Sequence, residues 1–375
     1  MVALTTFVTP LTVHSRARRS PPRLAFVRTF AGLVAHPASL RARLLPASPA
    51  ALLPSSVSSM TMGLPRLFSI LFRALVGTRV LNEPVVKALP VAARGNRRSG
   101  SSSSDEDVED AVGAAAAAAA AAGALRGDIL ALHTRYLSED GSSVDYDGLR
   151  TSPEFAAYVD RTRTLGALSP EVLTKRQRLV LFMNLYNALT IHAVCVAGAS
   201  TSSLGRLIWT TRMAYRVGDH VYSLSDMENG VLRGNSPMLI FSPPFGPSDP
   251  RRKVALPAAE PLIHMALNCA AASCPPVRYF EEDNVEEALE GAASSFLSDD
   301  ANCAVDSKAR TVHLSAIFSW YAVDFGGGSD EGVLGWVRDH LPEASDKRAE
   351  LTDLLSSSGS PVRVQINKYD WALNT

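Results

Sequence analysis

The chain has 375 residues, and its 37 Lys and Arg balance 37 Asp and Glu, so the formal net charge at pH 7 is zero. That balance excludes the strong overall field that would hold a protein on nucleic acid or on an anionic membrane. Four cysteines are too few for the disulfide framework of a small secreted protein, and they indicate reduced thiols inside a cell or organelle.

The N-terminal segment differs from the rest of the chain in composition. Its first 82 residues contain no Asp or Glu, while Arg recurs among Ser, Ala and Pro. This composition is typical of a transit peptide for a chloroplast or mitochondrion. We therefore predict that residues 1–60 are a disordered leader of an organellar protein. A basic tail that stays on a cytoplasmic protein is the alternative.

Low-complexity sequence follows the leader. Residues 101–110 combine a Ser run with an acidic cluster, and nine alanines occupy residues 114–122. The first segment has too little apolar surface to fold by itself, and alanine favours a helix but contributes little packing. The prediction is a linker over residues 61–125, followed by one globular domain over residues 126–375.

Helical and strand patterns alternate through this domain. Pro follows Ser at Ser152 and Ser169, which predicts two helix starts with a Ser cap and Pro in the first turn. The mixture predicts an α+β fold in which a long buried central helix packs with a small sheet. Helices are expected at residues 129–137, 175–197, 285–297, 332–340 and 347–356, and strands at residues 220–223, 262–268, 311–314 and 362–366.

The central helix, residues 175–197, is nearly free of charge over a length that approaches a bilayer span. It also carries Asn184 and Asn187, which are costly in lipid and inexpensive in a protein interior that offers hydrogen bonds. A soluble protein without a transmembrane segment is therefore predicted. Both asparagines lie on one helical stripe, where they either pin neighbouring loops or bind a ligand.

A second candidate site centres on Cys274, which follows a predicted strand bearing His264 and Asn268 on one face. A thiol becomes a nucleophile when a base lowers its pKa. Inert packing of Cys274 and redox pairing with Cys269 are the alternatives. The spacing of His264, Cys269 and Cys274 matches no standard zinc pattern, so we predict neither a metal nor a cofactor.

A third element joins Ser225 to Glu228 and Arg233. Glu228 falls three residues after Ser225, as a capping box requires. Its alternative role is to orient His264 or to pair with Arg233. The polar and aromatic ending, residues 369–374, is expected to dock against the core.

Several of these stretches together resemble the family called domain of unknown function 547, and in the family's order. The motif positions depart at Phe182, where the family has Trp, and at Asn229, where it has His. The resemblance implies no activity. Its segments are residues 144–146, 181–188, 223–233, 264–276, 317–327 and 369–374.

Three classes of function follow from these residues, and one of them is a purely structural or redox role. The first is a module that binds an unknown small molecule or protein through a polar core site formed by Asn184, Asn187, Asn268 and Arg233. The alternative is a thiol-dependent acyl hydrolase or transferase, in which Cys274 attacks, His264 moves the proton and Glu228 orients the ring. Whether the domain is an enzyme stays open, and a pocket that joins Cys274 to His264 would favour the second class.

Overall fold

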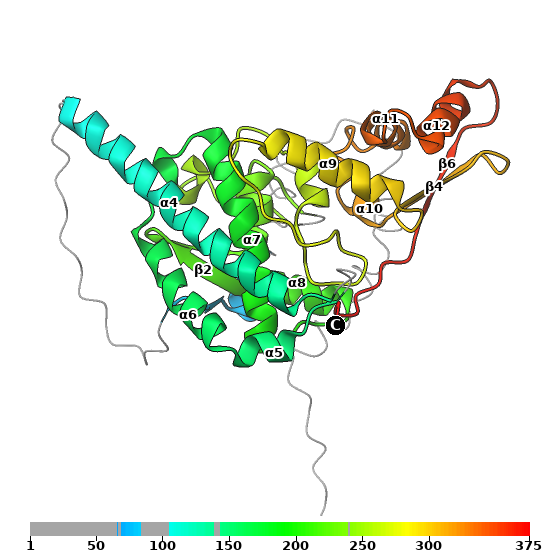
Figure 1. Ribbon diagram of the computed structural model, residues 1–375. Helices are drawn as coiled ribbons and strands as arrows, with labels where there is room; N and C mark the ends of the chain where they lie inside the picture. Colours follow the sequence, from blue (N-terminus) through cyan, green and yellow to red (C-terminus); the bar gives the residue numbers. More distant parts are fainter. Residues whose placement is uncertain (1–65, 67–68, 84–104, 139–142, 239–240) are drawn as a thin grey trace, which may run out of the picture.

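The computed structural model describes residues 66, 69–83, 105–138, 143–238 and 241–375. Figure 1 shows that α7 (Lys175–Ala197) lies centrally and that α4 (Asp105–Tyr136) crosses beside it. Helices and two small sheets make up the described chain, which confirms the predicted α+β class. The predicted leader, residues 1–60, lies outside the described residues.

The remaining elements are distributed along the whole described chain. They are, in order, β1 (Arg79–Val80), α5 (Tyr146–Thr151), α6 (Pro153–Arg161), η1 (Thr162–Ala167), η2 (Pro170–Val172), α8 (Ser203–Arg212), β2 (Met213–Val217), β3 (His220–Ser223), η3 (Asp226–Leu232), η4 (Pro250–Lys253), η5 (Pro261–Met265), α9 (Val285–Ser298), β4 (Cys303–Asp306), β5 (Thr311–Leu314), α10 (Ile317–Trp320), α11 (Asp330–His340), α12 (Asp346–Ser356) and β6 (Arg363–Ile366).

Helix α7 has the predicted bounds, and its ends explain why. Thr174 and Gln177 form a reciprocal capping box at the start, and Gly198 ends the helix with φ of 63°. The helix is long and apolar enough to cross a membrane, but 89% of its apolar window is buried inside the fold. That burial is the behaviour of a core helix in a soluble protein.

Two separate hydrophobic cores organise the domain. The first surrounds α7 and includes Phe182, Tyr215 and Leu232. The second packs α9, α11 and α12 around the β4–β5–β6 sheet, with Val312 and Phe325 fully buried. Figure 1 shows the second group beside the first, with the chain after β6 returning toward α5 and α8. The boundary between the cores is where the candidate site lies.

Each sheet has three strands and combines one parallel pair with one antiparallel pair. In the first sheet, β1 lies parallel to β2, and β2 lies antiparallel to β3. In the second, β4 lies antiparallel to β5, and β5 lies parallel to β6. Two small sheets therefore replace the single sheet that was predicted.

Most local predictions are confirmed. The strands at residues 220–223 and 311–314 have the predicted bounds, and Ser152 caps α6 with Pro153 in its first turn. The predicted cap at Ser169 is wrong, because its side chain makes no cap hydrogen bond and Pro170 begins only the short 3₁₀ helix η2. The predicted strand at residues 262–268 is wrong, because its first part is the 3₁₀ helix η5. Pro261 presets the backbone for a turn, and a short apolar run does not by itself distinguish a strand from a buried turn.

The packed unit also extends upstream of the predicted boundary. Strand β1 pairs with β2, and the Asn82 side chain donates hydrogen bonds to the carbonyls of Thr162 and Arg216 at 3.0 and 2.9 Å. Helix α4 runs through part of the predicted linker, and its first half projects beyond the rest of the fold (Figure 1). The boundary at residue 126 therefore leaves out residues 69–83, which pack against the domain.

Candidate functional site

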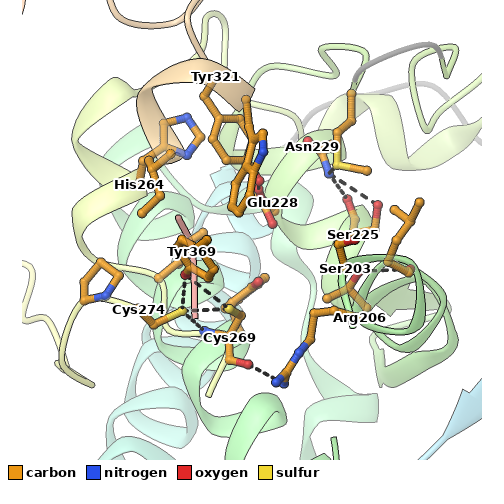
Figure 2. A pocket seen from close by; sticks show the side chains of 18 of the residues that line it. Ser203, Arg206, Ser225, Glu228, Asn229, His264, Cys269, Cys274, Tyr321 and Tyr369 are labelled. Carbon is orange, nitrogen blue, oxygen red and sulfur yellow. Dashed lines mark hydrogen bonds between the residues drawn. The ribbon is translucent and has the colours of Figure 1, made fainter. Parts of the chain in front are cut away.

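A cavity of about 140 Å³ lies where the two cores meet. Its walls come from α7, α8, η3, the loop after η5, α10 and the C-terminal tail. The predicted catalytic residues Cys274, His264 and Glu228 all line it, together with Arg206, Cys269 and several aromatic side chains (Figure 2). The pocket that the thiol hypothesis required is therefore present.

The loop that carries both cysteines is shaped by Asn268. Its side-chain oxygen accepts a hydrogen bond from the Ala270 amide at 2.6 Å, and its nitrogen donates to the Pro275 carbonyl at 2.6 Å. Ala270 has a positive φ of 61°, which a small residue tolerates better than a branched one. The Asn268 side chain thus links the two ends of the loop, at Ala270 and at Pro275.

The two asparagines of α7 hydrogen-bond to the backbone on either side of this loop. Asn187 donates to the carbonyls of Ala266 and Arg278, at 3.0 and 2.8 Å, and accepts from the Asn268 amide at 2.9 Å. Asn184 makes a reciprocal pair of 2.8 Å hydrogen bonds with the Phe280 backbone. These contacts match the interpretation that the asparagines pin loops, and neither they nor Asn268 line the 140 Å³ cavity.

The two loop cysteines lie in direct contact inside the cavity. Their Sγ atoms are 2.6 Å apart, and both thiols are free. The Cys269 backbone N–H donates to Cys274 Sγ at 3.1 Å, and the Tyr369 hydroxyl lies 3.1 Å from the same sulfur. Cys274 is therefore the sulfur toward which the donors converge (Figure 2).

These contacts separate the acidities of the two thiols. Burial alone would raise the pKa of Cys274, but hydrogen bonds from Cys269, Tyr369 and the backbone stabilise its thiolate and bring the pKa to about 7. The pKa of Cys269 is well above its ordinary value, first because of its hydrogen bond to Cys274 and then because of burial. Of the two sulfurs, Cys274 is therefore the one that ionises first as the pH rises.

The other two cysteines show the contrasting case. Burial raises the pKa of Cys195 to about 12 and that of Cys303 to about 11. Both side chains are buried and neither lines the cavity. They are thus packed hydrophobes, as most lone cysteines are.

The C-terminal tail docks against the core, as predicted, and forms one wall of the cavity. The Ala272 amide donates to the Ala372 carbonyl at 2.8 Å, and the Asp370 amide donates to Ser273 Oγ at 2.9 Å. Trp371 stacks on Trp320 with ring centroids 5.2 Å apart. The tail therefore supplies an aromatic wall in addition to the Tyr369 hydroxyl.

Arg206 of α8 is a buried cation in the cavity wall, with only 2% of its surface exposed. It donates to the Cys269 carbonyl at 2.7 Å and to the Trp371 carbonyl at 3.3 Å. Its Nε has no hydrogen-bond partner, and no carboxylate pairs with it within the described part of the chain. Arg206 therefore joins the cysteine loop to the tail, and its guanidinium lies over the Trp209 ring, 5.5 Å from the centroid, without a carboxylate partner among the described residues.

His264 belongs to a different hydrogen-bonded group. Its Nε2 lies 2.8 Å from Asp324 Oδ2, and its ring stacks on Tyr321 at 3.9 Å between centroids. Burial lowers the pKa of His264 despite the Asp324 contact, so the ring is neutral at pH 7. No hydrogen bond joins His264 to either thiol in the described structure. The predicted activation of Cys274 by His264 therefore lacks direct contact.

Asp324 takes the partners that had been assigned to Glu228. It pairs with both nitrogens of the Arg233 fork and with His264, and these bonds hold its pKa at about 2 although burial acts in the opposite direction. Glu228 instead accepts a hydrogen bond from the Tyr321 hydroxyl. Within the described residues, no hydrogen bond or ion pair joins the Glu228 carboxylate to His264 or to Arg233, whereas Asp324 contacts both. The role of Glu228 in orienting His264 or pairing with Arg233 therefore stays a prediction.

The predicted capping box is wrong. Residues of η3 form a π-helix, and Ser225 makes no cap hydrogen bond to its amides. Ser223 caps the turn instead, since its Oγ accepts from the Asp226 amide at 3.1 Å. Asn229 hydrogen-bonds to Ser225 and to Arg233, each four residues away along the chain. π-Helical turns are frequent at functional sites.

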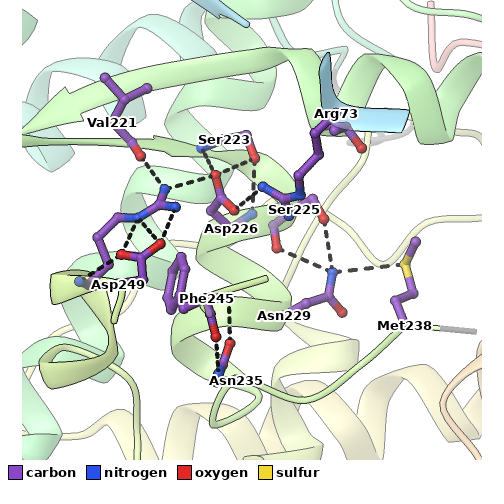
Figure 3. Close-up of polar contacts among 12 residues, drawn as sticks. Arg73, Val221, Ser223, Ser225, Asp226, Asn229, Asn235, Met238, Phe245 and Asp249 are labelled. Carbon is purple, nitrogen blue, oxygen red and sulfur yellow. Dashed lines mark hydrogen bonds and ion pairs between the residues drawn. The ribbon is translucent and has the colours of Figure 1, made fainter. Parts of the chain in front are cut away.

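A second polar cluster lies behind η3 and is fully paired. Asp226 accepts from Arg73 at 2.7 Å, from Arg251 at 3.3 Å, and from the Ser223 amide and hydroxyl (Figure 3). Arg251 also pairs with Asp249 at 2.8 Å. This cluster ties the upstream segment to the domain and does not line the 140 Å³ cavity.

Sequence reasoning missed Asp324, Tyr369 and Arg206 as members of the site. Asp324 lies inside the segment 317–327 that the family resemblance had singled out, and Tyr369 lies in the tail that was expected to dock. Arg206 had a weaker signal, as a basic residue among the buried positions of α8. Within the described residues, no group of three His, Cys, Asp or Glu side chains is arranged to hold a metal ion.

Comparison with known families identifies one domain in the chain. Residues 170–297 match the family model described as "Protein of unknown function, DUF547", so the predicted resemblance is confirmed and a domain of this family is present. The matched segment carries α7, η3 and the cysteine loop. No curated protein and no solved structure shows a significant match to the chain.

Proposed function

We propose that the DUF547 domain binds a small molecule in this cavity and exchanges thiol and disulfide groups with it through Cys269 and Cys274. The observation that carries the proposal is the 2.6 Å contact of the two sulfurs, inside a cavity and with unequal acidities. A thiolate is the attacking form in this chemistry, and a second thiol within reach completes it.

The reaction balances with a disulfide, R–S–S–R, as the oxidant. The Cys274 thiolate attacks one substrate sulfur, a Cys274–S–S–R bond forms, and the substrate S–S bond breaks to release one thiolate. Cys269 then gives its proton to a leaving thiolate and attacks Cys274 Sγ, which releases the second R–S group. Two electrons pass to the substrate, and the protein is left with a Cys269–Cys274 disulfide. Two equivalents of a thiol donor return the pair to its reduced form.

The test uses the full-length reduced protein and the neutral aromatic disulfide 2,2′-dithiodipyridine. We expect rapid release of two equivalents of pyridine-2-thione and a mass loss of about two daltons as an internal disulfide forms. The Cys269→Ser variant should release one equivalent and keep a pyridylthio group on Cys274 as a mixed disulfide. Cys195→Ser serves as the matched control and should react like the unmodified protein.

The pH dependence gives an independent measurement. Because hydrogen bonds lower the pKa of Cys274 to about 7, its alkylation by iodoacetamide should be nearly maximal at pH 8 and fall about tenfold per pH unit below 7. If Cys274 reacts no faster than Cys303 in the folded protein, the proposal is wrong. An adduct on both Cys269 and Cys274 without an internal disulfide also contradicts it.

The hydrolase or transferase hypothesis is the second candidate, and the Asp324–His264 contact at 2.8 Å favours it. An imidazole whose Nε2 donates to Asp324 leaves Nδ1 as an acceptor, and His264 lines the same cavity as Cys274. With p-nitrophenyl acetate, this candidate predicts an acetyl group on Cys274 that turns over, and a slower deacylation in His264→Gln. An acetyl group that persists for hours would exclude turnover.

A further inference from the structure

We infer that the cavity selects disulfides and thiols of low molecular weight that carry a carboxylate, with Arg206 as the residue that binds it. This inference rests on the proposed thiol–disulfide exchange and names its substrate class. The observation behind it concerns the Arg206 side chain, which lines the cavity although only 2% of the residue's surface is exposed. No carboxylate pairs with it within the described residues.

The charge on Arg206 has an energetic consequence. Arginine stays protonated, and a buried charge is normally paired because removing it from water costs several kcal/mol. The two carbonyls that Arg206 contacts, of Cys269 and Trp371, use two of its five N–H donors. Its Nε is left without a partner in the described structure. A bound anion would compensate the charge, which among the described residues otherwise meets only these two carbonyls and the Trp209 ring, whose centroid lies 5.5 Å from the guanidinium carbon.

The position of Arg206 sets where that anion would lie. Its guanidinium donates to the backbone carbonyl of Cys269. A carboxylate bound to Arg206 would therefore lie near Cys269, whose sulfur contacts Cys274. Figure 2 places Arg206 on the Cys269 side of the cavity and Glu228 beside Tyr321. Among the described residues, Glu228 is the one carboxylate that lines the cavity, and it accepts a hydrogen bond from the Tyr321 hydroxyl. The Arg206 side is therefore the anion-binding side.

The size and walls of the cavity define the rest of the molecule. A volume of about 140 Å³ is close to the engineered cavities of roughly 150 Å³ that hold a benzene molecule. Trp320, Trp371 and Tyr369 give aromatic faces, which favour a planar or apolar group. The space fits one arm of a small disulfide, so we exclude a folded protein surface from the proposal.

The cysteine pair is the competing partner for Arg206. The hydrogen bond to Cys274 and burial raise the pKa of Cys269 well above its ordinary value, and the Arg206 guanidinium acts in the opposite direction. The two roles predict different results. A residue that serves only the thiolate changes the rate with every disulfide alike. A residue that binds a substrate carboxylate changes the rate with anionic disulfides alone.

The experiment compares two chromogenic aromatic disulfides that differ in charge: 5,5′-dithiobis(2-nitrobenzoate), with a carboxylate on each ring, and neutral 2,2′-dithiodipyridine. Rates at Cys274 in the folded full-length protein are divided by those of the urea-unfolded chain, which removes intrinsic reactivity. We expect the corrected ratio to favour the anionic probe, and Arg206→Gln to lower that ratio roughly tenfold.

Arg206→Lys keeps the charge, and we expect it to retain most of the preference even if its two carbonyl contacts are lost. Arg212→Gln, an exposed position on the same helix, is the matched control and should leave the ratio unchanged. An equal loss with both probes in Arg206→Gln, or no preference in the unmodified protein, overturns the inference while exchange at Cys274 still stands. Failure of both probes to react at Cys274 contradicts the proposed function instead.

Discussion

The π-helix η3 separates two buried polar clusters that differ in how completely they are paired. Behind it, Asp226 receives hydrogen bonds from Arg73, Arg251 and Ser223. In front of it, the cavity wall contains Arg206, which has no carboxylate partner among the described residues. The same cavity contains the cysteine pair, in which the pKa of Cys274 is lowered. Complete pairing indicates a cluster that stabilises the fold, whereas spare hydrogen-bonding capacity in a cavity indicates a site.

The largest expected effect comes from breaking the paired cluster. Asp226→Ala leaves Arg73 without its carboxylate and removes two hydrogen bonds from Ser223, so the free energy of unfolding should fall by roughly 3 kcal/mol. Urea denaturation measures this loss. Under native conditions, the alkylation rate of Cys274 should not change.

Asp339→Ala is the control for this substitution, because its carboxylate is more than half exposed and pairs only with neighbouring Arg338 in the described structure. Its effect should be within about 0.5 kcal/mol. A small effect of Asp226→Ala would contradict the assignment of the paired cluster to stability. A changed rate at Cys274 would show that the two clusters are coupled.

An intermediate effect is expected at the support of the cysteine loop. Asn187→Leu removes three hydrogen bonds, to Ala266, Arg278 and Asn268, and leaves their backbone groups buried. The free energy of unfolding should fall by about 1–3 kcal/mol in urea denaturation. Asn284→Leu, at an exposed position with no side-chain cap bond, should be nearly neutral. A neutral or stabilising Asn187→Leu would remove that side chain from the polar network.

The smallest effect tests what activates the thiol. Tyr369→Phe removes a hydroxyl that lies 3.1 Å from Cys274 Sγ, so the alkylation pKa of Cys274 should rise from about 7 by about one pH unit. Tyr321→Phe is the matched control, because its hydroxyl donates to Glu228 instead of a sulfur. An equal rise in both variants would attribute the low pKa to general packing and not to the Tyr369 hydroxyl.

Several features of this protein follow from local sequence alone. The bounds of α7, the caps at Ser152 and Thr174, and the strands at residues 220–223 and 311–314 depend on contacts within a few positions. Cys274 and His264 could be chosen as candidates because their chemistry is intrinsic to the side chain. The error at residues 262–268 arose because a short apolar run fits both a strand and a turn.

Only the tertiary structure decided which side chains act together. His264 meets Asp324 across 60 residues, and Cys274 meets Tyr369 across 95 residues. Periodicity reports the face on which a residue lies, but not which distant segment packs against that face. The choice of Asp324 over Glu228, and the burial of Arg206 beside the thiol pair, therefore came from the packing of the two cores and the docked tail.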